Sequence, residues 1–168
     1  MSLDSLWAPW RGEYIKKAMG SEESTDNCVL CNAPCEEDCK KALVLHSGRY
    51  NYIIMNLYPY NLGHVMVVPH EHVNAVDCLS DEVRNEHYML VARAAKVLRS
   101  FFKCEGFNIG MNMGRSGGAG IDQHIHTHIV PRWNGDTNFM PIIADTKVMS
   151  STLFEVYDGL KESFDGYK

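Results

Sequence analysis

The stretch from Ser80 to about Lys103 repeats apolar residues at the spacing of an α-helix, and this limits the folds open to the chain. Ser80 is a favourable N-cap, and the acidic Asp81 and Glu82 lie in the first turn, where they stabilise the helix dipole. One long helix is therefore expected. Its apolar residues fall on one face and are Val83, Leu90, Val91, Ala94, Val97, Leu98 and Phe101.

Runs rich in β-branched and aromatic residues lie on both sides of this helix. They span 42–46, 50–56 and 64–69 before it, and 107–113 and about 124–130 after it. Turn-forming residues join neighbouring runs, and a last helix is expected over 152–164. Because short links rather than helices connect most strands, an α+β fold with an antiparallel sheet and helices on one side fits best.

Length and charge narrow the class of protein. With 168 residues, 45% of them hydrophobic, the chain fits a single domain. Its net charge of −5 argues against a partner that is a nucleic-acid polymer. No apolar run reaches the roughly 18–20 residues that span a membrane, and the start lacks the pattern of a signal peptide. The expected location is the cytoplasm.

Four of the six cysteines lie close together, at positions 28, 31, 35 and 39. In a cytoplasmic chain such a cluster indicates thiolate metal ligands more than a disulfide framework. The two isolated cysteines, Cys78 and Cys104, are expected to be ordinary apolar packing residues.

Three histidines alternate with other residues in the run His124-Ile125-His126-Thr127-His128. On a strand, alternate side chains point to the same face, so the run places three imidazoles together. Imidazole is polar and titrates near neutral pH, which makes this a poor packing choice. The loop just before it, 114–120, is rich in glycine, and its backbone amides can approach an anion closely. The sequence thus predicts an anion site lined by histidines.

The same run resembles the motif of the histidine triad (HIT) family, with Thr127 at a slot that is normally apolar. A second match is the segment from Asn56 through Pro59 and Gly63-His64 to Pro69. Residues 131–139 and 6–11 are similar to a bacterial branch that includes diadenosine tetraphosphate phosphorylases and hydrolases, so the resemblance extends nearly end to end.

The resemblance implies a single HIT domain over 1–168, with an N-terminal extension at 1–27 and a C-terminal extension at 134–168. The implied fold is a five-stranded antiparallel sheet with a long helix packed on it, plus N- and C-terminal helical extensions. It also implies a homodimer in which the sheets of two copies form one ten-stranded sheet.

By the same resemblance, the middle histidine of the run attacks the α-phosphorus of a nucleotide, adenine nucleotides being favoured. A neutral imidazole is a competent nucleophile, and a nucleotidyl-histidine splits one hard displacement into two. That nucleophile is His126, with its other N–H anchored on a backbone carbonyl near His124. His128 stabilises developing charge or assists the leaving group, and His64 lines the phosphate pocket.

The resemblance assigns substrate contacts more loosely. Apolar residues such as Ile53 and Leu62 are expected to face the base. The polar and glycine positions expected to bind substrate are Asn56, Asn112, Ser116, Gly118 and Trp133.

Zinc-containing relatives imply a structural zinc site of Cys28, Cys31, His72 and His124. Two thiolates and two imidazoles close a tetrahedral site and leave no position for a catalytic water. An all-thiolate site that uses Cys35 and Cys39, or simple reduced surface thiols, are the alternatives. No organic cofactor is expected.

Several activities fit these residues. The nucleotidyl-histidine is hydrolysed if water attacks it and phosphorolysed if phosphate does. Ala119 and Gly120 stand where the phosphorylases have Gly-Ser, which leaves the second nucleophile open. A non-catalytic nucleotide-binding or adaptor protein is one alternative, and an enzyme that binds a catalytic metal through His124, His126 and His128 is another.

Overall fold

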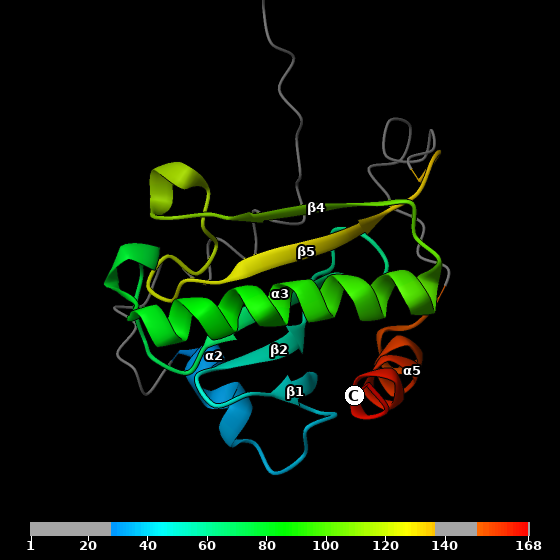
Figure 1. Ribbon diagram of the computed structural model, residues 1–168, viewed down its shortest axis with the longest axis horizontal. Coiled ribbons are helices and arrows are strands. Elements are labelled where there is room, and N and C mark those ends of the chain that lie inside the picture. Colours follow the sequence, from blue (N-terminus) through cyan, green and yellow to red (C-terminus); the bar gives the residue numbers. More distant parts are fainter. Residues whose placement is uncertain (1–27, 137–150, 168) are drawn as a thin grey trace, which may run out of the picture.

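A computed structural model describes residues 28–136 and 151–167 of the chain, and it shows an α+β fold built on one five-stranded sheet (Figure 1). The strand order is β1-β2-β3-β5-β4, and every neighbouring pair is antiparallel, as expected. The strands are β1 (Val44–Ser47), β2 (Asn51–Met55), β3 (Val65–Pro69), β4 (Gly106–Met111) and β5 (Thr127–Arg132).

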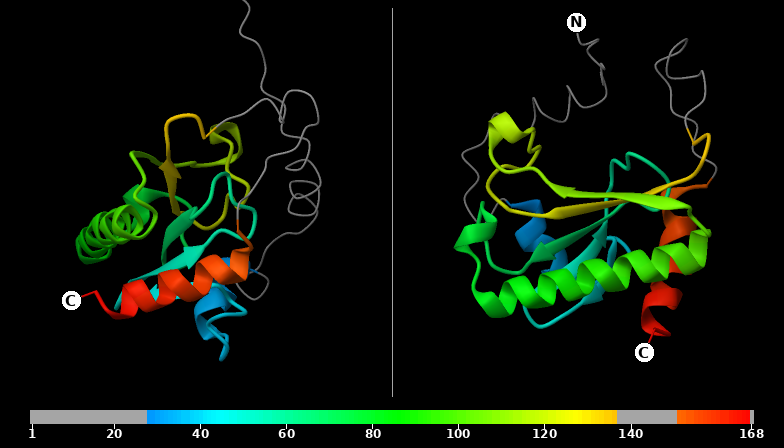
Figure 2. Two further views of the ribbon diagram at one scale, coloured as in Figure 1. Left: turned by 90° about the vertical axis from the view of Figure 1, so that its right-hand side faces the viewer. Right: turned by 45° about the horizontal axis from the view of Figure 1, so that its top comes forward.

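The long helix, α3 (Asp81–Phe102), lies along one face of the sheet (Figure 2). Ser80 is its N-cap, with its side chain accepting a hydrogen bond from the Val83 amide at 3.4 Å, and Lys103 ends it in a left-handed conformation. The buried residues recur at helical spacing and include most of the predicted apolar face, with His87 also within it, whereas Phe101 is 40% exposed.

The C-terminal helix, α5 (Leu153–Asp165), packs beside β1 and α3 (Figure 1). Thr152 and Glu155 form a reciprocal capping box at its start. Buried Tyr157 donates a hydrogen bond to the Val44 carbonyl at 3.0 Å. This helix confirms the one expected at 152–164, whereas the N-terminal extension lies outside the described residues.

On the opposite face of the sheet lies a short helix, α2 (Val29–Asn32), continued by the 3₁₀ turn η2 (Ala33–Cys35). Neighbouring strand residues point to opposite faces. Asn51 reaches α3, since it donates to the Val83 carbonyl, so Tyr52 points away from α3, and its hydroxyl donates to the Leu30 carbonyl at 2.5 Å. The cysteine-rich segment is thereby fixed to the sheet face that α3 leaves open.

Two expectations need correction. The strand expected from His124 begins only at Thr127, because both neighbours stop pairing there: Thr127 pairs with Val67 of β3 and with Met111 of β4, the last partner in each ladder. His124 and His126 therefore precede the strand, where the Ile125 amide donates instead to the Val73 carbonyl at 2.7 Å.

The isolated cysteines also differ from each other. Cys104 is buried as expected, whereas Cys78, in the 3₁₀ turn η3 (Val76–Cys78), is exposed. Among the described residues, no helix combines the length and the apolar character that crossing a membrane requires.

Candidate active site

Three imidazoles from two segments meet at the start of β5. The His126 and His128 rings lie edge to face with their centroids 4.7 Å apart, and His64, which precedes β3, places its Nε2 3.0 Å from His128 Nδ1. His64 and His126 are almost fully buried, at 1% and 4% exposed, and His128 is half-buried. The structure thus brings together the three residues expected to be catalytic.

The backbone fixes which nitrogens carry protons in this cluster. The Tyr60 amide donates to His64 Nδ1 at 3.1 Å, so that nitrogen is an acceptor and the proton of neutral His64 lies on Nε2. His64 Nε2 then donates to His128 Nδ1. Neutral His128 consequently carries its own proton on Nε2. The chain of contacts sets His128 up as a proton donor.

His126 is oriented in a different way. Its Nδ1 donates to the backbone carbonyl of His124 at 2.8 Å, which leaves the lone pair on Nε2. Burial lowers the pKa of His126, and the bond to the His124 carbonyl offsets this only in part. The ring is therefore neutral near pH 7, with Nε2 as its basic atom.

A second cluster lies at the other end of the histidine run. The Sγ atoms of Cys28 and Cys31 are each 3.4 Å from His124 Nδ1, and Cys31 Sγ is 3.1 Å from His72 Nδ1. One potential ligand atom from each of these four residues lies within 4.8 Å of every other. Cys35 and Cys39 are exposed and are not part of this group.

Three sulfur–nitrogen distances in this group, at 3.1–3.4 Å, are close to those of a tetrahedral zinc site. Zinc holds sulfur at about 2.3 Å and imidazole nitrogen at about 2.0 Å, so ligand atoms around one ion are roughly 3.3–3.8 Å apart. His124 Nε2 donates to the Pro69 carbonyl at 2.9 Å, which leaves Nδ1 unprotonated and turned toward the thiols. A backbone partner on the far nitrogen is the usual support of a histidine ligand.

A groove of about 580 Å³ opens on the face away from α3. Ile54 of β2 and Met66 of β3 line it and pair across the strands, and Met66 pairs in turn with His128. This row of side chains leads from the groove to the histidine cluster. The groove wall also includes Val29 and Leu30 of α2.

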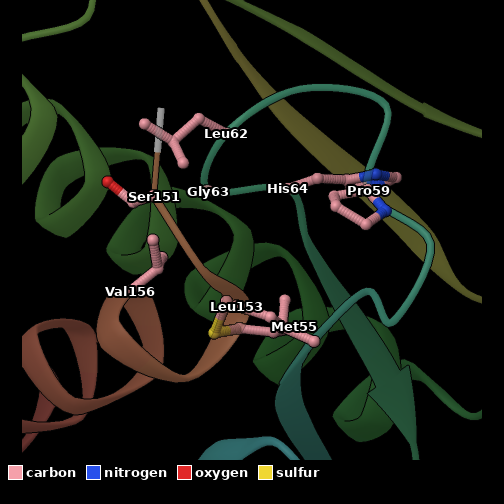
Figure 3. Close-up of a pocket in the computed structure, with 8 residues that line it drawn as sticks. All are labelled: Met55, Pro59, Leu62, Gly63, His64, Ser151, Leu153 and Val156. Carbon is pink, nitrogen blue, oxygen red and sulfur yellow. The ribbon is translucent and has the colours of Figure 1, made fainter. Parts of the chain in front are cut away.

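The two apolar residues expected to face the base are not among those that line this groove. Ile53 is fully buried and shares a sheet face with Asn51, which contacts α3, so it points away from the groove. Leu62 lines a separate apolar pocket of about 220 Å³ beside the start of α5, together with Met55 and Leu153 (Figure 3). For Ile53 the reason is strand register, since a shift of one residue along β2 exchanges the two faces. Leu62 lies in the loop between β2 and β3, and His64 lines the same pocket.

The loop between β2 and β3 carries Asn56 and His64 and is held at several points. Asn56 Oδ1 accepts from the Tyr58 amide at 2.9 Å, and its Nδ2 lies 3.4 Å from His64 Nδ1. Gly63 has a φ of +73°, and a side chain there would meet the Phe102 ring of α3. Asn56 thus borders both the histidine cluster and the groove.

Asn61 and Asp136 anchor the same loop, and no sequence pattern pointed to either residue. Buried Asn61 donates to the Pro131 carbonyl at 3.0 Å and to Asp136 at 2.8 Å. Asp136 also takes two bonds from Arg132, which lower the pKa of its carboxyl well below the usual range. The Arg132 guanidinium therefore hydrogen-bonds to Asp136 within the fold.

The glycine-rich loop forms the 3₁₀ turn η4 (Arg115–Gly117), and it uses several of its own amides. The amides of Gly117, Gly118 and Ala119 donate to carbonyls within the loop at 3.0–3.3 Å. Gly118 adopts a left-handed φ of +82°, and Ser116 is exposed. A phosphate contact at Ser116 or Gly118 stays a prediction.

The last two expected substrate residues lie at the ends of strands. Asn112 is half-buried directly after β4. Trp133 follows β5, and its ring packs at 90° to Phe102, with Nε1 donating to the Phe102 carbonyl at 3.4 Å. The described contacts of Trp133 are therefore packing contacts with α3, and its substrate role stays a prediction.

The sequence is similar to known proteins over most of its length. It matches the HIT domain family over residues 38–135. It is 36% identical over 155 residues to an AP-4-A phosphorylase of Mycobacterium tuberculosis, covering 90% of this chain and 79% of that protein.

An adenosine 5′-monophosphoramidase of Schizosaccharomyces pombe is 29% identical over 113 residues, covering 64% of this chain and 76% of that one. Among solved structures, a zinc-bound histidine triad family protein from Mycobacterium smegmatis has the same fold. Its TM-score is 0.64 at 20% identity, covering 84% of this chain and 96% of that chain.

Proposed function

We propose that this chain, which belongs to the HIT domain family, cleaves a nucleotide at its α-phosphate in two displacements, with His126 as the nucleophile. The chain is a nucleotide hydrolase or phosphorylase of that family, in line with the activities named for its relatives. The proposal concerns the roles of individual residues, the second nucleophile, the zinc and the assembly.

The proposed role of His126 is supported by one hydrogen bond. Its Nδ1–H donates to the His124 carbonyl, so the nucleophilic lone pair lies on Nε2. In the first step, Nε2 forms a bond to the α-phosphorus, and the bond from that phosphorus to the leaving oxygen breaks. In the second step, an acceptor attacks the same phosphorus, the N–P bond breaks and the imidazole is restored. Each step is a displacement that a neutral imidazole can perform near pH 7.

His128 is proposed to give its Nε2 proton to the leaving oxygen. The contact from His64 Nε2 to His128 Nδ1 supports this role, because it keeps the proton of neutral His128 on Nε2. General acid catalysis of this kind contributes about 10²–10⁴-fold. His64, which the Tyr60 amide holds in place, is proposed to orient His128 as well as to line the phosphate pocket.

The groove beside Ile54 and Met66 is proposed to hold the nucleoside. Its volume of about 580 Å³ and its apolar walls suit a nucleobase. Asn56, at the end of the groove nearest His64, is positioned to contact the ribose. The relatives that act on adenine nucleotides favour adenosine as that nucleoside.

Phosphate is the favoured second nucleophile, and water is the alternative. The similarity to an AP-4-A phosphorylase over 90% of this chain supports phosphate, with diadenosine tetraphosphate as substrate. Ala119 and Gly120, which replace the Gly-Ser of that branch, are the residues that argue for water.

A structural zinc ion is proposed to bind Cys28, Cys31, His72 and His124. When bound, the ion supplies cross-linking rather than a reactive water, because four protein ligands fill its tetrahedral shell. His124 would then be held from both sides, by the ion and by the Pro69 carbonyl, and would brace the segment that carries His126.

A cytoplasmic homodimer is also proposed. β4 is an edge of the sheet, and Ile109 on it is 49% exposed. On α3, Tyr88 and Met89 are 70% and 71% exposed, which leaves large apolar side chains in water. Pairing of two β4 edges would cover that edge and produce a ten-stranded sheet. A purely monomeric species in sedimentation would reject the dimer.

The activity test uses diadenosine tetraphosphate with and without inorganic phosphate. Attack on the α-phosphorus releases ATP and leaves an acid-labile adenylyl adduct on the protein. Water then yields AMP and phosphate yields ADP, so the products identify the acceptor. His126→Ala should abolish both adduct and turnover, while His70→Ala, at an exposed histidine outside the cluster, should behave like the wild type. Turnover that persists in His126→Ala would refute the nucleophile.

A further inference from the structure

His87 is a buried histidine that the proposed reaction does not use. It lies on the sheet face of α3, is 2% exposed, and places its Nε2 2.6 Å from the Thr127 hydroxyl. Its other nitrogen, Nδ1, lies 2.9 Å from Asn51 Oδ1 on β2. Thr127 is the residue between His126 and His128, and its face of the strand is the one turned toward α3.

The direction of each hydrogen bond in this group follows from its neighbours. Asn51 Nδ2 donates to the Val83 carbonyl at 3.1 Å and to Glu86 at 3.0 Å, so its Oδ1 is the atom that accepts from His87. His87 therefore carries its proton on Nδ1 and accepts the Thr127 hydroxyl proton on Nε2. Burial lowers the pKa of His87 to about 4, which agrees with a neutral ring.

The far end of the chain of bonds is fixed to the backbone. Glu86 accepts from the amides of Arg49 and Tyr50 at 2.8 and 2.7 Å, so the series runs from the β1–β2 turn through Glu86, Asn51 and His87 to Thr127. In each hydrogen bond of this series, a donor faces an acceptor. A fully paired buried network of this kind fixes geometry as well as contributing stability.

We propose that His87 is a positioning residue: through the Thr127 hydroxyl it fixes the place of His126 and His128 relative to the nucleotide groove. An apolar residue at 127 would fill the same space but would have no directional bond to α3. The two flanking histidines lie on the groove side of the same backbone, so a shift of Thr127 moves both. A misplacement of about 1 Å in a reacting group can cost on the order of 10²-fold in rate.

This inference rests on the proposed function, because it assumes that His126 is the nucleophile. The two are separable by experiment. Loss of turnover in His126→Ala tests the function, whereas the positioning role is tested by whether the hydroxyl of residue 127 controls the rate of the chemical step.

The experiment compares Thr127→Val, which keeps the shape and removes the hydroxyl, with Thr127→Ser, which keeps the hydroxyl. Single-turnover formation of the adenylyl adduct and steady-state kcat and KM are measured for both. Thr127→Val should slow adduct formation and kcat by about 10- to 100-fold, with KM changed less than about threefold. Thr127→Ser should stay within about threefold of the wild type.

A control separates positioning from general destabilisation. Val97→Ala opens a cavity on the buried face of α3 away from Thr127, and should lower Tm with little change in kcat. If Thr127→Val fails to fold, His87→Gln and His87→Leu form a second pair, because only glutamine can accept from Thr127. Wild-type kcat in Thr127→Val or His87→Leu would overturn the proposal, and so would equal losses within either pair.

Discussion

His124 and His126 are two residues apart and are both almost fully buried, yet their imidazoles carry protons on opposite nitrogens. The Pro69 carbonyl takes the Nε2 proton of His124 and leaves Nδ1 to face two thiols. The His124 carbonyl takes the Nδ1 proton of His126 and leaves Nε2 for chemistry. A backbone carbonyl placed beside each ring thus decides whether the histidine suits a metal ion or a phosphorus atom.

His87 differs from both, because each of its ring nitrogens has a partner within the fold. Asn51 occupies one of its nitrogens and Thr127 the other, so neither is left for a ligand. His124, His126 and His87 differ in which ring nitrogen, if any, is left unbonded after the fold has satisfied its own polar groups. Substitutions should therefore separate into those that affect chemistry, metal binding or geometry.

The largest effect is expected from a substitution of the proposed nucleophile, His126. His126→Gln keeps a donor for the His124 carbonyl but has no nucleophilic nitrogen, so turnover should fall by on the order of 10⁴-fold or more. Metal content and Tm should stay near the wild-type values, because the four proposed ligands are untouched. Elemental analysis and thermal unfolding provide these two readouts. Loss of metal in His126→Gln would mean that the nucleophile and the metal site are not independent.

Removing the metal should lower the stability of the fold, which His126→Gln should leave unchanged. Zinc sites of this type contribute several kcal/mol to folding, so a chelator or Cys28→Ser should lower Tm by roughly 10 °C or more for a chain of this size. Nucleotide affinity should weaken as well, since Cys28 is the N-cap of α2 and Cys31 lies within it, and the same helix places Val29 and Leu30 in the groove wall.

The matched control for the metal is Cys78→Ser, because Cys78 is exposed and lies outside the cluster. It should retain metal, Tm and nucleotide affinity. Wild-type protein that contains no zinc after purification without chelators would disprove the site.

A smaller loss is expected when the proposed proton donor is removed. His128→Ala should lower kcat by about 10²–10³-fold. A substrate whose leaving group is a much weaker base than ATP, such as the 2,4-dinitrophenyl ester of AMP, should recover most of this loss, because that group departs without a proton. The same ester should not rescue His126→Gln. Equal rescue of both variants would mean that the two histidines do not have distinct roles.

The smallest effect concerns His87 and pH. Its pKa is about 4 in the folded protein and about 6.5 in an unfolded chain. Above pH 6.5 the ring is neutral in both states, whereas between pH 6.5 and 4 the unfolded chain binds the proton and the folded protein does not. Stability should therefore fall as pH drops through this window, by at most about 3 kcal/mol from this residue.

Urea unfolding of the wild type and of His87→Gln at pH 7.5 and pH 4.5, with zinc saturating, measures that contribution as a difference. The variant should show a weaker dependence on pH. The same slope in both proteins would show that His87 is protonated without cost in the folded state.

The elements of the fold were predictable because their signals are local. The N-cap at Ser80 and the helical period after it gave α3 almost residue by residue, and the capping residues Thr152 and Glu155 mark the start of α5. The antiparallel pairing of the strands also followed from short runs and short links, whereas the strand order and the start of β5 did not. Most of the candidate site came from the motif, which records residue identities but not proton positions.

The order of amino acids specifies which side chains are available: three alternating histidines, a C-x-x-C pair, His64 after a glycine turn, and Thr127 at an apolar slot. Their partners depend on how the chain folds in space. Cys28 and His124 are 96 residues apart, and His87 and Thr127 are 40 apart. Hydrogen bonds depend on distance and direction in space, which local periodicity cannot specify, so the division of His124, His126 and His87 into three roles emerges only when the chain is folded.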